Sequence, residues 1–281
     1  MKRMAPLTLL WALAAMPVAA ETLLERGTYL MRSIVACGNC HTVQTPDGPA
    51  PGGELAGGLA IKFDEFDAYP SNITPDVATG IGTWTDGQII AAIREGRRPD
   101  GSIIGPPMPI GLYSRISDGD AKAIVAYLRS VPALSNKIPK SVYRIPLPPS
   151  YGPPVAGVPE VSRDDPVAYG AYLAGPLGHC LECHTPFVKG RPDFDNALGA
   201  GGFEFPGPWG VSVSSNITPH ADDGIADYSD AELKTVITTG VRPGGSRLLP
   251  PMGIAYYRNI SDADLDALVA YLRSLKPLPS P

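Results

Sequence analysis

Two five-residue segments, Cys37–His41 and Cys180–His184, share the pattern C-x-x-C-H. Two thiols three positions apart lie about one helical turn apart, so they can bond to the two vinyl groups of one porphyrin. The histidine that follows can then turn its imidazole toward the iron. The spacing predicts two covalently attached c-type haems, one held by Cys37, Cys40 and His41 and the other by Cys180, Cys183 and His184.

Two other kinds of site use the same residue types. A C-x-x-C pair can be a redox dithiol, and two such pairs can together bind zinc. A zinc site would need the pairs to meet across about 140 residues of chain, and it would leave the adjacent histidine in each copy unexplained. All four cysteines lie in the two segments, so none remains for a structural disulfide. Only the haem interpretation uses every residue of both motifs.

The sixth ligand of each iron is expected to be a methionine. The two histidines outside the motifs, His179 and His220, both lie in the second part of the chain and are interpreted as surface residues. Met108 and Met252 occupy equivalent positions, and each follows two prolines that restrict the loop backbone. The alternative is a loop methionine that only packs against other side chains. Ligation by His41 with Met108, and by His184 with Met252, would close both irons for one-electron transfer.

The first twenty residues have the pattern of a secretory signal peptide. Lys2 and Arg3 precede an apolar stretch over 7–15, and small residues at 18–20 provide a cleavage site. We expect a mature chain that begins at Glu21 and lies in the periplasm. An uncleaved membrane anchor is the alternative, but the apolar run is short for a span. No later segment has ~18 continuous apolar residues, so no transmembrane segment is expected in the mature chain.

Several segments recur after 143 or 144 residues, which indicates an internal duplication. Gly27–Leu30 recurs as Gly170–Leu173, and the sequence Ser-Asn-Ile-Thr-Pro occurs at 71–75 and at 215–219. The segment between the copies is rich in proline, which favours a semi-rigid connector. The predicted organisation is a signal peptide over 1–20, a first domain over 21–137, a linker over 138–165 and a second domain over 166–281.

Each copy is expected to be helical. Capping residues and apolar spacing predict helices over 23–34, 86–95 and 117–130 and, in the second copy, over 167–174, 230–238 and 261–274. Thr85 and Ser229 are the expected N-caps of the middle helices. Tyr127 and Tyr271 are expected to pack against the early glycines, Gly27 and Gly170. No alternating run is long enough to indicate a sheet, so the predicted fold class is all-α, with two tandem haem domains.

These motifs resemble tandem class I cytochrome c domains. More narrowly, the chain resembles the cytochrome c subunits of bacterial membrane-associated dehydrogenases for alcohols, gluconate and related sugar acids. The resemblance rests on C-x-x-C-H, Ser-Asn-Ile-Thr-Pro, Pro-Pro-Met and the final Ala-Tyr-Leu-Arg-Ser helices, and it covers nearly all of the mature chain. Those subunits typically carry three haem motifs and reduce quinone, whereas this chain has two. The resemblance therefore implies electron transfer but not direct quinone reduction.

The expected function is that of a periplasmic dihaem cytochrome that carries single electrons between redox proteins. It would accept electrons from a dehydrogenase and pass them to the respiratory chain through a terminal oxidase or another cytochrome. It would work without intrinsic catalysis, and peripheral association with a membrane complex is compatible with its sequence. The alternative is a dihaem enzyme such as a cytochrome c peroxidase, which would need one displaceable sixth ligand. A net charge of −5 disfavours nucleic acid as a partner.

Overall fold

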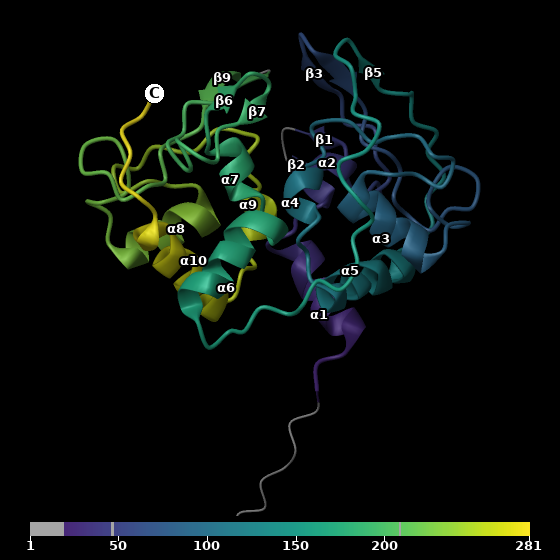
Figure 1. The fold of residues 1–281 in the computed structure, drawn as a ribbon, viewed down its shortest axis with the longest axis horizontal. Coiled ribbons are helices and arrows are strands. Elements are labelled where there is room, and N and C mark those ends of the chain that lie inside the picture. Colours follow the sequence, from purple (N-terminus) through teal and green to yellow (C-terminus); the bar gives the residue numbers. More distant parts are fainter. Residues whose placement is uncertain (1–19, 46–47, 208) are drawn as a thin grey trace, which may run out of the picture.

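Two sets of helices lie side by side in the computed structural model, which describes residues 20–45, 48–207 and 209–281 (Figure 1). The predicted signal peptide lies, except for Ala20, outside the described residues. The first half, residues 20–137, contains α1 (Leu23–Arg32), α2 (Gly38–His41), α3 (Asp86–Glu95), α4 (Ile110–Tyr113) and α5 (Asp118–Ser130). The second half, residues 166–281, contains α6 (Pro166–Tyr172), a π-helix (Leu173–Leu177), α7 (Cys180–Cys183), α8 (Asp230–Thr239), α9 (Ile254–Tyr257) and α10 (Asp262–Ser274).

The middle helices, α3 and α8, begin and end where the capping residues predict. Thr85 and Ser229 each accept a hydrogen bond from the backbone three residues on, and the side chain there bonds back to the cap. These capping boxes satisfy backbone groups that the first turn leaves unpaired. Gly96 and Gly240 end the helices in the left-handed conformation, with φ of 63° and 68°. The predicted caps and stops of both helices are confirmed.

Each first helix crosses the last helix of its own half at a glycine. α1 packs against α5, and α6 packs against α10. A Cβ atom at Gly27 would lie 1.9 Å from the carbonyl oxygen of Ala123, and one at Gly170 would lie 2.0 Å from that of Ala267. The predicted neighbours Tyr127 and Tyr271 also touch these positions. Only a residue without a side chain allows so close an approach, which confirms the structural interpretation of both glycines.

The all-α prediction is wrong, because the segments between the helices form short antiparallel sheets. The strands are β1 (Gln44–Thr45), β2 (Gly48–Pro49), β3 (Ile61–Phe63), β4 (Phe66–Ala68), β5 (Val142–Tyr143), β6 (Phe187–Val188), β7 (Arg191–Pro192), β8 (Glu204–Gly207) and β9 (Gly210–Val213). β3, β4 and β5 form one three-stranded sheet, and the others pair as two-stranded hairpins. Strands of two to four residues are too short to show an alternating pattern. The fold is therefore mixed, with helices around the core and hairpins at its edge.

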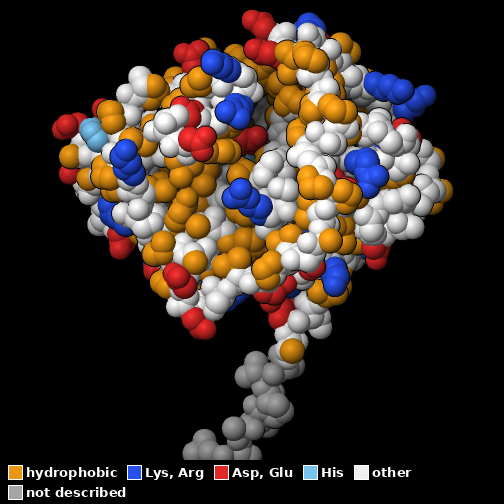
Figure 2. All heavy atoms as spheres, viewed as in Figure 1, with side chains coloured by type: hydrophobic (Ala, Val, Ile, Leu, Met, Phe, Trp, Pro, Cys, Tyr) orange, Lys and Arg blue, Asp and Glu red, His pale blue; other side chains and the backbone are white. Residues whose placement is uncertain are grey.

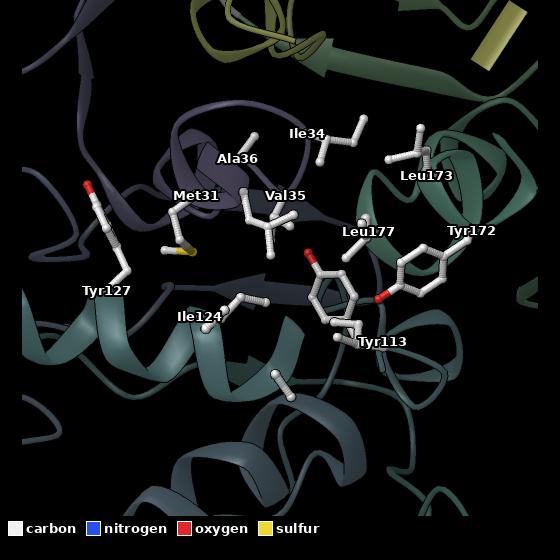
Figure 3. Packing of buried hydrophobic residues seen from close by; sticks show 14 of the residues in the cluster. Met31, Ile34, Val35, Ala36, Tyr113, Ile124, Tyr127, Tyr172, Leu173 and Leu177 are labelled. Carbon is white, nitrogen blue, oxygen red and sulfur yellow. The ribbon is translucent and has the colours of Figure 1, made fainter. Parts of the chain in front are cut away.

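One buried hydrophobic cluster contains side chains of both halves (Figure 3). Ile34 and Tyr113 come from the first half, and Leu173 and Leu177 from the second, and each is at most 4% exposed. Figure 3 shows these side chains gathered in one region rather than in two separate groups. Because burial of apolar area is the main stabilising contribution, the two halves share part of their folding energy.

A buried tyrosine of the second half bonds to the start of α5 in the first half. The hydroxyl of Tyr172 donates to Oδ2 of Asp120 at 2.8 Å and accepts from the backbone nitrogen of Ser117 at 3.0 Å. Arg26 of α1 donates to both carboxylate oxygens of the same Asp120, at 2.7 and 3.0 Å. Three elements from two halves thus meet at one carboxylate.

The equivalent tyrosine of the first half makes the reciprocal contact. The hydroxyl of Tyr29 donates to Oδ2 of Asp264 at 2.7 Å and accepts from the backbone nitrogen of Ser261 at 3.1 Å. Ser261 caps α10 as Ser117 caps α5. The two halves are therefore joined by a pair of matched bonds, each linking the first helix of one half to the last helix of the other.

The segment that connects the halves, residues 138–165, lies along the first half. β5 extends the sheet of β3 and β4. Further on, Glu160 accepts hydrogen bonds from the hydroxyl of Ser117 and the backbone nitrogen of Gly119, both at 2.8 Å. The backbone nitrogen of Asp118 donates to the carbonyl of Val158 at 3.0 Å. These bonds attach the connecting segment to the N-terminus of α5.

The surface carries both signs of charge among apolar side chains. Figure 2 shows Lys, Arg, Asp and Glu side chains scattered over both halves of the viewed face. This face has no continuous basic surface of the kind that nucleic acid binds. Within the described ranges, none of the helices has the length and apolarity required to span a bilayer.

Candidate haem sites

Both C-x-x-C-H segments form a single helical turn. The backbone nitrogen of His41 donates to the carbonyl of Cys37, and that of His184 donates to the carbonyl of Cys180, each at 2.9 Å. These bonds close one turn of helix between the first cysteine and the histidine. The paired thiols therefore have the helical spacing that attachment to one porphyrin requires.

Each histidine is oriented by a backbone carbonyl. Nδ1 of His41 lies 2.7 Å from the carbonyl oxygen of Ser71, and Nδ1 of His184 lies 2.7 Å from that of Ser215. A carbonyl can only accept, so Nδ1 carries the proton and Nε2 keeps a free lone pair. Burial lowers the pKa of both imidazoles, although the carbonyl contact opposes the shift, so they are neutral at pH 7. A neutral imidazole with a free Nε2 is the form that binds iron.

The orienting carbonyls belong to the repeated Ser-Asn-Ile-Thr-Pro segments. In the first half Asn72 accepts from the backbone nitrogen of Thr74 at 2.9 Å and donates to the carbonyl of Leu134, beyond α5, at 2.7 Å. Asn216, Thr218 and Leu278 repeat this arrangement in the second half. The segment is thus tied to the chain that leaves the last helix. Sequence reasoning found the repeat but missed this role, because the bond comes from a backbone carbonyl.

None of the four cysteines forms a disulfide, and each is half-buried. Burial raises the pKa of Cys37 to about 12 and that of Cys180 to about 11. A thioether carries no charge, so a buried position of this kind fits covalent attachment. The zinc alternative needs several donors at one point. In the part of the chain that the structure covers, no three His, Cys, Asp or Glu side chains are grouped as a metal site.

The two predicted methionines occupy matched loops. Each loop is closed by a bond from the residue two positions on: Ile110 donates to the carbonyl of Met108, and Ile254 to that of Met252, both at 2.9 Å. Both side chains are half-buried and pack against the main buried cluster, as Cys37 and Cys180 also do. The structure thus places each methionine and its haem motif around the same core.

The remaining histidines differ from each other. His179 was predicted at the surface, but its ring packs edge-on against Tyr113 of the first half, with centroids 5.8 Å apart. Burial lowers its pKa to about 4. Nδ1 of His220 lies 3.6 Å from a carboxylate oxygen of Asp223. His179 is therefore part of the contact between halves, which its neighbourhood in sequence does not reveal.

Both haem motifs pack against the buried cluster that the two halves share. Burial, and then the neighbouring carboxyl of Glu182 in α7, raise the pKa of Cys40 in α2 to about 11. Burial also raises the pKa of Glu182 itself to about 8. An electrostatic effect of this kind requires that the side chains lie close together. The two candidate sites thus adjoin one shared cluster, although about 140 residues separate them in sequence.

Comparison with known proteins finds a cytochrome c domain and similar cytochrome c subunits. Residues 167–276 match the cytochrome c family. The chain is 33% identical to the cytochrome c subunit of alcohol dehydrogenase (quinone) from Gluconobacter oxydans, over 93% of this chain and 56% of that protein. It is 30% identical to the gluconate 2-dehydrogenase cytochrome c subunit of Pantoea cypripedii, over 95% of this chain and 63% of that protein. It is also 28% identical to a diheme cytochrome c-type protein of Cereibacter sphaeroides, over 84% and 81% of the two chains.

The chain spans only about half to two thirds of the two dehydrogenase subunits. A cytochrome c domain implies covalently bound haem c. The helical C-x-x-C-H turns, the half-buried cysteines and the oriented imidazoles fit that group. Residues 167–276 are thus a cytochrome c domain, and the chain is similar to the cytochrome c subunits of bacterial alcohol and gluconate dehydrogenases.

Proposed function

We propose that this protein is an exported dihaem c-type cytochrome that carries single electrons between redox proteins. The observation that carries the proposal is the pair of matched imidazoles, each held at 2.7 Å by a serine carbonyl beside a C-x-x-C-H turn. One such site would support one haem, and its repetition supports two. The dihaem relative from Cereibacter sphaeroides is consistent with that number.

The proposed iron ligands are His41 with Met108 and His184 with Met252. The two methionine loops support this proposal, because each is closed by the same backbone hydrogen bond to the methionine carbonyl. Both methionines also pack against the same buried cluster as the attachment segments. Bound haem would supply a one-electron couple, and ligation by histidine and methionine raises its potential. The protein's own part is to hold each imidazole neutral and correctly turned, and to keep water from the site by burial.

The proposed organisation consists of a cleaved signal peptide, residues 1–20, two duplicated cytochrome domains, 21–137 and 166–281, and a connecting linker, 138–165. The support is the repetition of matched details: the two glycine crossings, the two asparagine-anchored segments and the two reciprocal tyrosines. Such details recur in the same order along both halves. A duplication accounts for them without requiring each to arise twice.

The proposed location is the periplasm, and the proposed electron donor is a dehydrogenase. Relatives named as cytochrome c subunits of alcohol and gluconate dehydrogenases support this class of partner. Electrons would then pass to the respiratory chain through another cytochrome or a terminal oxidase. The acidic balance of residues 151–281, with 9 basic and 15 acidic side chains, would steer a basic partner surface toward the second half.

Mass and spectra of the purified protein test the proposal. The denatured mature chain should exceed the mass of the polypeptide from Glu21 by two haem groups. Met108→Ala and Met252→Ala should each convert one haem, and only one, to a high-spin or weakly ligated form. If both variants keep two unaltered low-spin haems, the two methionines are not the ligands. Rapid turnover of peroxide by the unaltered protein would favour the peroxidase alternative over an electron carrier.

A further inference from the structure

The attachment segment of the first half touches the methionine loop of the second. Nδ2 of Asn39, between the cysteines of the first motif, donates to the carbonyl oxygen of Pro251 at 2.9 Å. Pro251 immediately precedes Met252. A Cβ atom at Gly253, immediately after Met252, would lie 3.6 Å from the amide carbon of Asn39. The Asn39 side chain therefore lies against the backbone on both sides of Met252.

A second contact supports the same loop. A Cβ atom at Gly38 would lie 2.0 Å from the hydroxyl oxygen of Tyr256, on α9 just beyond the loop. A larger residue at Gly38 would clash with the end of the Tyr256 side chain. The glycine thus allows the Tyr256 side chain, from the helix that follows Met252, to lie directly on the haem motif of the other half.

The methionine loop of the first half is held in a different way. A Cβ atom at Gly105, three residues before Met108, would lie 2.6 Å from the ring of Tyr143 and 2.8 Å from Leu147, both in the connecting segment. The hydroxyl of Tyr151 also donates to the carbonyl of Ile104 at 2.9 Å. The connecting segment therefore covers this loop.

The second half receives no such cover. Leu249, the counterpart of Gly105, is 47% exposed, and Pro250 and Pro251 are exposed as well. The second motif makes no equivalent bond to the Met108 loop, because Glu182 occupies the position that Asn39 has in the first motif. The Glu182 side chain has no amide N–H of the kind that Asn39 donates, and burial alone shifts its pKa, with no hydrogen bond to that side chain among the described residues. The bond from Asn39 is thus specific to the Met252 loop.

We infer that Asn39 is a positioning residue for Met252, so that the first half stabilises the ligand loop of the second. The inference rests on the proposed ligation by Met252. The hydrogen bond limits the excursions of an exposed loop and keeps the thioether in place. Weakening it raises the fraction of time that the second iron lacks its methionine, while the Met108 loop keeps its own support from the connecting segment.

Displacement of methionine by added imidazole tests this in the full haem-loaded chain. Stopped-flow spectroscopy should resolve two phases, one for each haem, and the phase that Met252→Ala abolishes belongs to the second half. Asn39→Asp keeps the size of the side chain but removes its donor, and Asn39→Ala removes it without adding charge. Both should accelerate the second-half phase by about 2- to 10-fold, the effect of one hydrogen bond, and leave the other phase within about 2-fold.

Asn259→Ala is the matched control. Nδ2 of Asn259 donates to the carbonyl of Arg32, also at 2.9 Å and also across the two halves, but outside the methionine loop. This variant should leave both phases unchanged. An unchanged second-half phase in both Asn39 variants, or equal acceleration in Asn259→Ala, would overturn the inference. If Met252→Ala itself abolishes neither phase, the proposed ligand fails instead, so the two failures are distinguishable.

Discussion

Replacement of Tyr172 by phenylalanine should lower the free energy of unfolding by about 2–4 kcal/mol. The hydroxyl makes two hydrogen bonds, to Oδ2 of Asp120 at 2.8 Å and from the backbone of Ser117 at 3.0 Å. Tyr172 is 6% exposed and Asp120 4%, so water cannot easily replace either bond. A hydrogen bond to a charged group contributes about 1.5–3 kcal/mol, and a stranded buried donor costs about 1–3 kcal/mol. Asp120 keeps its two bonds from Arg26, which limits the loss.

The reciprocal variant, Tyr29→Phe, should cost at least as much, about 2–4 kcal/mol. Its hydroxyl makes matched bonds to Asp264 and Ser261, and Asp264 is only 1% exposed, although Tyr29 itself is half-buried. Asp264 has no bidentate arginine like the one that Asp120 keeps, because Arg163 lies 3.7 Å from its Oδ1, so the buried carboxylate loses its bond at Oδ2. Tyr271→Phe is the control, since no hydrogen bond to its hydroxyl is found within the described part of the chain. Its effect should stay within about 0.5 kcal/mol.

Guanidinium unfolding of the haem-loaded protein measures these differences. Haem absorbance and far-ultraviolet circular dichroism should give coincident transitions if the halves unfold together. A double-mutant cycle of Tyr172→Phe with Asp120→Ala should give a coupling energy of about 1–3 kcal/mol. A loss in Tyr172→Phe no larger than that in Tyr271→Phe would refute the reasoning. A loss in Tyr29→Phe much smaller than that in Tyr172→Phe would contradict the argument from the burial of Asp264.

Two further perturbations follow from the packing and the ion pairs. Gly170→Ala should destabilise the protein by about 2–3 kcal/mol, because its Cβ atom would lie 2.0 Å from the carbonyl of Ala267. Gly87→Ala, with nothing within 4 Å, should instead stabilise by about 0.5–1 kcal/mol, and thermal unfolding distinguishes the two. The hydrogen bond from Arg94 lowers the pKa of Asp118 from its ordinary 3.8, so its stabilisation is present above that pH and disappears as pH falls through the lower folded value. The difference in melting temperature between wild type and Asp118→Asn should therefore shrink below about pH 4, and an undiminished difference would contradict it.

Helix positions could be predicted from local residues, because helix ends depend on neighbours in sequence. Thr85 and Gly96 bound α3 through bonds within a few residues of chain, and Ser229 and Gly240 bound α8 in the same way. The spacing of each C-x-x-C-H motif is local as well. The resemblance to cytochrome c domains followed from such short motifs, and the comparisons confirmed it.

The strands could not be predicted in this way. β8 and β9, which pair as a hairpin, have four residues each, and β1 and β2 have two residues each. Their pairing depends on how the loops meet around the helices, not on an alternating pattern. The all-α expectation failed because it treated these loops as having no regular structure.

The sequence by itself determined the residue types that could hold two haems and the helices that carry them. It also limited the axial ligands, because histidines and methionines are few. Only the tertiary structure decided what orients those residues. The carbonyls of Ser71 and Ser215, and the bond from Asn39 to Pro251, join positions that are far apart in the chain. A backbone carbonyl has the same chemistry at every residue, so only folding can select which one a side chain meets.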